Sequence, residues 1–94
     1  MALARVVQFD GVDGSRVEEM VREVQEGERP PDVPATEFMM LHDPDAERML
    51  VLFFFDNEAD YEKGDAALNA MPSGDTPGRR TAVTRYDVAV RVTA

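Results

Sequence analysis

The chain has no cysteine and no tryptophan, and His42 is its only histidine. The missing cysteines exclude disulfides, thiol nucleophiles and cysteine-based zinc sites. One histidine is also too few for a zinc site built on imidazole, so we expect neither a metal ion nor another cofactor. The absence of disulfides fits a reducing compartment, and we expect a cytoplasmic protein.

Basic residues are scarce as well. The 94 residues include 19 acidic and 10 basic side chains, which gives a formal net charge of −9 at pH 7. This charge opposes binding to nucleic acid and to anionic membrane surfaces, so we expect neither partner. The longest apolar run covers residues 49–55, and it is far shorter than the ~20 residues that span a bilayer.

That apolar run is the most informative segment of the chain. A strand with one wet face alternates apolar and polar residues, and residues 49–55 do not alternate. Such a strand requires apolar surroundings on both faces. About two helices are available in a chain of this length, and they cover only one face of a sheet. A second copy of the chain is therefore expected to cover the other face, with an interface that includes Leu52, Phe53 and Phe54.

The remaining segments predict two helices between four strands. Apolar patterning predicts strands at residues 3–9, 36–42, 48–55 and 83–92. A capping box at residues 15–18 predicts a helix that begins at Ser15 and ends at Gly27. A second helix is expected after Asp56 or Asn57. Its inward stripe comprises Tyr61, Gly64, Leu68 and Met71. Residues 28–34 and 72–81 are expected to be loops.

This βαββαβ order is typical of a ferredoxin-like α+β domain. Right-handed crossovers place both helices on one face of a four-stranded antiparallel sheet. At this length the whole chain, residues 1–94, forms one such domain. Two sheets packed face to face would then give a dimeric α/β barrel.

Two segments are similar to a known family. Residues 64–71, GDAALNAM, and residues 76–81, TPGRRT, resemble small actinobacterial members of the antibiotic-biosynthesis-monooxygenase-like domains. These domains belong to the dimeric α/β-barrel superfamily, which the order of elements resembles along the whole chain. The resemblance implies that fold. The superfamily includes cofactor-independent monooxygenases, haem-degrading enzymes, isomerases and proteins of unassigned activity, so it constrains function only weakly.

Three residues are candidates for catalysis. Histidine is the side-chain type that most often serves as a general base near neutral pH, so His42 is either a general base or haem ligand, or a strand-end residue bonded to the turn that follows. Arg5 shares a face with apolar residues and either holds an anion or pairs with Asp87. Asn69 either faces a pocket or closes its helix. The resemblance implies asparagine with arginine or histidine around a pocket between sheet and helices. Haem-degrading members also use tryptophan, which this chain lacks.

Three functions remain open at this point. The first is a homodimer of unassigned function that binds a small apolar or aromatic molecule. The second is a cofactor-independent monooxygenase or isomerase, in which Arg5 or His42 stabilises an enolate and Asn69 orients oxygen or substrate. The third is a structural or regulatory dimer without a ligand. Polar groups that converge between sheet and helices would favour the second, and a space filled by Met and Phe would favour the third.

Overall fold

The helices and strands follow the predicted order. The computed structural model describes residues 2–27, 32–70 and 78–93. It contains, in chain order, β1 (Leu3–Asp10), α1 (Gly14–Glu26), β2 (Glu37–Asp43), β3 (Arg48–Phe55), α2 (Glu58–Asn69) and β4 (Arg79–Asp87). No helix among the described residues has the length and apolar character needed to cross a membrane.

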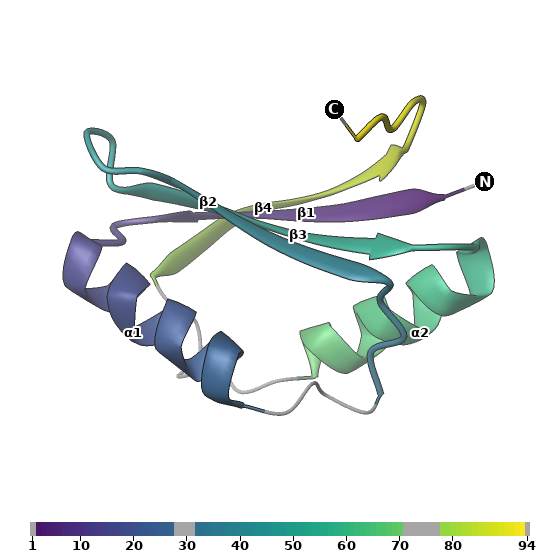
Figure 1. Ribbon diagram of the computed structural model, residues 1–94, viewed down its shortest axis with the longest axis horizontal. Coiled ribbons are helices and arrows are strands. Elements are labelled where there is room, and N and C mark those ends of the chain that lie inside the picture. Colours follow the sequence, from purple (N-terminus) through teal and green to yellow (C-terminus); the bar gives the residue numbers. More distant parts are fainter. Residues whose placement is uncertain (1, 28–31, 71–77, 94) are drawn as a thin grey trace.

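The four strands form one antiparallel sheet with the order β2-β3-β1-β4. Both helices lie on the same side of this sheet, and the other side carries no helix (Figure 1). This arrangement confirms the ferredoxin-like α+β fold. We call the two sides the helix side and the open side.

The pleat of the sheet assigns each residue of β3 to one of these sides. Met49, Val51 and Phe55 are buried among residues that contact the helices, and Phe53 packs beside them. Leu50, Leu52 and Phe54 alternate with them and lie on the open side. The expected interface therefore divides. Leu52 and Phe54 lie on the open side, which a second sheet could cover. Phe53 lies on the helix side and therefore cannot take part in that interface.

The core consists of two clusters on the helix side. One cluster lies toward α1 and contains Val7, Phe9, Val12, Met49 and Val51. The other lies toward α2 and contains Leu3, Phe55 and Tyr61. Phe53 packs against both clusters. Phe53 thus connects the two apolar clusters on the helix-side face of the sheet.

The start of α1 corrects the sequence prediction. The N-cap is Asp13 rather than Ser15, because Asp13 Oδ1 accepts a hydrogen bond of 2.9 Å from the backbone N–H of Arg16. This bond lowers the pKa of Asp13, and a second bond from the Ser15 hydroxyl contributes in the same direction. The other caps are as predicted: Gly27 ends α1, and Asn57 caps α2.

The limits of β4 also differ from the prediction. Residues 79–82 belong to the strand, because Arg79 and Arg80 continue the pairing with β1 beyond a bulge at Thr81. Residues 88–92 do not, because β1 begins at Leu3 and offers no partner beyond the bond from Val88 N–H to the Ala2 carbonyl. Residues 28–31 and 71–77, which include Met71 and most of the second expected loop, lie outside the described residues.

Gly64 allows α2 to approach the sheet closely. A Cβ atom at this position would overlap the ring of Phe55, whereas one at Gly14 of α1 would meet nothing within 4 Å. We therefore expect Gly64→Ala to destabilise the protein by about 1–3 kcal/mol despite the better helix propensity of alanine. Gly14→Ala is the matched control and should be neutral or slightly stabilising. Urea unfolding of both variants measures the difference, and equal effects would refute the close approach.

Candidate functional site

Arg5 is a charged residue inside the core. Its exposed fraction is 2%. Among the described residues it is the only charged residue that is buried. It lies on the helix side of β1, where its cross-strand neighbours are Phe53 on β3 and Arg85 on β4. A buried guanidinium requires partners for its N–H groups, because an unpaired charge in an apolar interior is very costly.

Helix α2 supplies those partners. Arg5 Nε donates to Asp65 Oδ1 over 2.7 Å, and Arg5 Nη2 donates to Asn69 Oδ1 over 3.0 Å. Asp65 and Asn69 are four residues apart on α2 and therefore lie on one face of the helix. The Asn69 amide also donates to Asp65 Oδ2 over 3.3 Å. The expected partner of Arg5, Asp87, was wrong: the carboxylate comes from the helix.

A second arginine reaches the same oxygen. Arg80 Nη1 donates to Asn69 Oδ1 over 3.2 Å. The bulge at Thr81 makes this contact possible, because an uninterrupted strand would place Arg80 on the open side with Ala82 and Thr84. We refer to Arg5, Asp65, Asn69 and Arg80 as the Arg5 cluster. Arg80 was not among the candidate residues, because residues 72–81 were expected to form a loop and the bulge has no signal in the residue pattern.

Tyr61 and Arg85 lie next to the Arg5 cluster. The Tyr61 ring packs edge-on against Phe55 with ring centres 5.4 Å apart, and the Arg85 guanidinium lies 5.0 Å from its centre. Arg85 also pairs with Glu58 of α2 over 3.2 Å. Burial raises the pKa of Tyr61, and the nearby Asp65 carboxylate raises it further. The hydroxyl therefore stays protonated at neutral pH and can donate a hydrogen bond.

His42 lies at the other end of the sheet. Its ring Nε2 is 3.2 Å from the carbonyl oxygen of Val12, in the connection between β1 and α1. The bond is thus to that connection and not to the turn at Asp43. In the register His42 faces Met49, which in turn faces Phe9, about 13 Å along β1 from Arg5. The structure brings Arg5 and Asn69 together and separates His42 from both.

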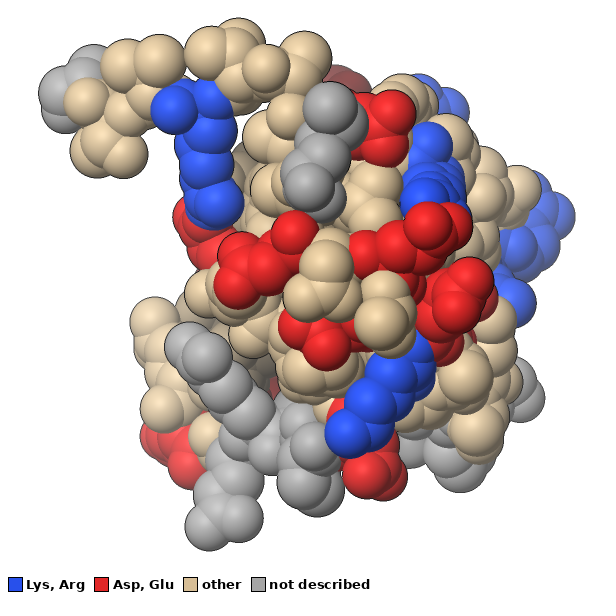
Figure 2. Space-filling model, turned by 90° about the vertical axis from the view of Figure 1, so that its right-hand side faces the viewer, with Lys and Arg blue, Asp and Glu red and all other residues tan. Residues whose placement is uncertain are grey.

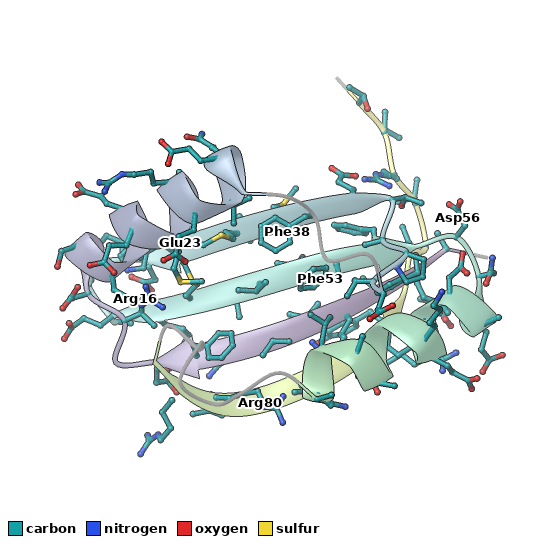
Figure 3. The ribbon with its side chains drawn as sticks, turned by 90° about the horizontal axis from the view of Figure 1, so that it is seen from below. Arg16, Glu23, Phe38, Phe53, Asp56 and Arg80 are labelled. Carbon is teal, nitrogen blue, oxygen red and sulfur yellow. The ribbon has the colours of Figure 1, made fainter. Side chains whose placement is uncertain are left out.

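An aromatic pair adjoins the Arg5 cluster. Phe38 and Phe53 meet edge to face with ring centres 4.9 Å apart. Both are only partly buried, and both lie on the helix side between α1 and α2 (Figure 3). Because Phe38, Phe53 and Arg5 are successive cross-strand neighbours, they form one row across the sheet. This row changes from apolar to charged within three strands.

Helix α1 covers this region incompletely. None of its residues is buried, and Val24 on its apolar stripe is 48% exposed. Val17 and Met20 make the contacts with the core. Apolar surface of α1 therefore remains exposed, and Phe38 and Phe53 on the sheet remain partly exposed.

The surroundings of the site are acidic. Acidic side chains gather across the end of the molecule that carries α2 (Figure 2). At the start of α2, Asp56, Glu58 and Glu62 are exposed, where they suit the positive end of the helix dipole. In the part of the chain that the structure describes, no group of His, Cys, Asp or Glu could hold a metal ion.

Comparison with known proteins identifies the fold. No protein-family model matches the sequence, and no curated protein matches it. The structure is similar to the crystal structure of a protein from Chloroflexus aurantiacus J-10-fl assigned to the antibiotic biosynthesis monooxygenases. The TM-score is 0.56 with 10% sequence identity, over 100% of this chain and 96% of the other. The ferredoxin-like fold of the single chain that the resemblance implies is thereby confirmed, and at this identity the likeness concerns the fold alone.

The raised pKa of Tyr61 predicts a pH dependence of stability. The unfolded chain releases this proton near pH 10, while the folded chain retains it to higher pH. The folded state then binds more protons, so the free energy of unfolding falls as pH rises above about 10. The Tyr86→Phe variant leaves Tyr61 as the only tyrosine, and its absorbance at 295 nm should show a midpoint above pH 10 while circular dichroism reports a folded chain. A midpoint at or below 10 would contradict the burial. As a control, Tyr61→Phe should lose less stability between pH 9 and 11.

Proposed function

We propose that the protein is a homodimer that binds a small apolar or aromatic molecule on the helix side of its sheet. One observation carries this proposal: the row of Phe38, Phe53 and Arg5 places a partly exposed aromatic surface directly beside a polar cluster built on a buried arginine. Ligand sites commonly combine an apolar lining with a few fixed polar groups. The absence of cysteine favours a location in the reducing cytoplasm.

The test uses 2-acetylnaphthalene, a neutral two-ring ketone, as the probe. Phe53→Leu keeps the apolar character of the site but removes the ring, and ring pairs contribute about 0.5–1.5 kcal/mol beyond buried area. We expect this change to weaken binding several-fold, measured by ligand-observed NMR or calorimetry. Phe54→Leu is the matched control, because it makes the same change one residue along β3 on the open side.

Two results would count against the binding proposal. If the probe does not saturate the wild-type protein, the binding proposal fails and a structural or regulatory dimer without a ligand is favoured. Equal losses in both leucine variants would place the binding surface elsewhere than on the helix side.

The open side supports the dimer. Leu41 and Tyr86 are 47% and 55% exposed there, and Leu50, Leu52 and Phe54 between them are only half-buried. An apolar sheet face of this kind is unusual for a monomer, and a second copy would meet it with the same residues.

The C-terminal segment extends this face. Residues 88–93 leave β4 and pass on the open side, where Arg91 pairs with Glu37 and lies 4.8 Å from the centre of the Phe54 ring. Val90 and Val92 of this segment remain exposed. A second copy that covers the sheet would also bury these valines, which favours a homodimer over a small ligand as the occupant of the open side.

We expect Phe54→Asp to convert the dimer to a monomer or to insoluble protein. A dimer interface would force the new carboxylate out of water without a partner, which costs several kcal/mol. Light scattering coupled to size-exclusion chromatography measures the mass, and Phe54→Leu should remain a dimer. A soluble Phe54→Asp dimer, or a wild-type monomer, would refute the face-to-face arrangement.

A second candidate function is catalysis by a cofactor-independent monooxygenase or isomerase. The observation that favours it is the hydrogen bond between Arg5 and Asn69, since two of the three candidate residues are in contact and one of them, Arg5, is buried. His42 takes no part in that arrangement, and the candidate rests on Arg5 and Asn69 alone. Both functions require binding, but only the enzyme would consume oxygen or convert the bound compound.

A further inference from the structure

Two guanidinium groups converge on one neutral oxygen in the Arg5 cluster. Asn69 Oδ1 accepts from Arg5 over 3.0 Å and from Arg80 over 3.2 Å. The two cations repel each other, and an amide oxygen carries only a partial negative charge to offset this. A carboxylate matches two guanidinium groups better, because it carries a full negative charge and two acceptor oxygens.

The charges of the cluster do not balance. Among the described residues Asp65 supplies the only carboxylate for Arg5, and Arg85 is already paired with Glu58. Of the carboxylates in residues 2–27, 32–70 and 78–93, none forms an ion pair with Arg80. Within that described part, two positive charges of the cluster therefore face one negative charge, on a chain whose formal net charge is −9.

The end of α2 offsets part of this excess. Asn69 is the last residue of the helix, where the helix dipole is equivalent to about half a negative charge. Roughly half a positive charge remains, and it sits on Arg80 at the exposed side of the cluster. Since Arg80 is exposed while Arg5 is buried, an incoming anion would reach Arg80 first.

The side chains next to the arginines indicate the chemical character of the rest of the ligand. Phe53 is the cross-strand neighbour of Arg5, and Phe38 continues the row away from the arginines. A molecule whose acidic group lies at Arg80 therefore has aromatic side chains available for its body. Figure 3 shows Arg80 and the two phenylalanines on the same side of the sheet.

We propose that the Arg5 cluster is a carboxylate-binding site, with Arg80 as the residue that selects an aromatic carboxylic acid over a neutral aromatic molecule. The inference rests on the proposed binding function and names the chemical class of its ligand. Arg80 acts by direct contact with the ligand, and Arg5 and Asn69 hold the site in place.

The experiment compares two probes that differ in charge. 2-Naphthoate and 2-acetylnaphthalene share the ring system and the carbonyl group, but only naphthoate is an anion at pH 7. Calorimetry at low salt should give about tenfold tighter binding of naphthoate, since charge-assisted hydrogen bonds are roughly twice as strong as neutral ones. The preference should fall as salt is added, because the site is partly exposed.

Arg80→Gln is the decisive variant. It should weaken naphthoate binding about tenfold and leave the affinity for 2-acetylnaphthalene within twofold. Arg79→Gln removes a charge from the adjacent residue of β4, which the bulge places toward the open side, and should change neither affinity. Arg80→Lys keeps the charge but loses the fork, so it should retain only part of the preference.

The outcomes separate the two proposals. If both probes bind equally well, or if the preference survives in Arg80→Gln, the carboxylate site is refuted while the binding function stands. If neither probe binds the wild-type dimer, the binding function fails and the carboxylate site fails with it. A preference that is lost in Arg80→Gln and kept in Arg79→Gln supports both.

Discussion

The burial of the Arg5 guanidinium is the constraint on which the rest of the helix side depends. A charge that is 2% exposed must be paired, and both partners come from α2. The helix can supply them only if Asp65 and Asn69 face the sheet, which fixes its rotation. It must also lie close to the sheet, and Gly64 makes room for the Phe55 ring. Tyr61, one turn away from Asp65, is then buried against the same ring.

Much of the fold could be predicted from the sequence, because local patterns decide it. The seven apolar residues of β3 do not alternate, and β3 does lie in the interior of the sheet with β1 and β2 on either side. The βαββαβ order and the caps at Gly27 and Asn57 also follow from local signals. Where two local signals competed, the prediction failed. Asp13 and Ser15 can both cap a helix, and the carboxylate of Asp13 takes the N–H of Arg16.

The site was only partly predictable, because it depends on register and on a bulge. Arg5 was recognised as a polar residue on an apolar face, and Asn69 as a residue that either faces a pocket or closes its helix. Asn69 is the last helical residue, and its side-chain amide contacts Arg5 across the space between helix and sheet. Arg80 could not be found, since it fell in the loop expected at residues 72–81, and alternation continued back from β4 would assign it to the open side. The inserted Thr81 reverses that assignment, and only the pairing with β1 reveals it.

Stability alone does not account for the Arg5 cluster. Replacing a buried ion pair by apolar residues of similar volume is often neutral or stabilising, because desolvation of the charges costs as much as their attraction returns. Position 5 lies between Leu3 and Val7 on an apolar face, where a methionine or leucine would pack without any partner from α2. The chain instead retains a guanidinium there and adds a second one at Arg80, on the edge strand β4. A cluster that stability does not demand, placed beside an accessible aromatic pair, is better explained by recognition of a ligand than by the fold.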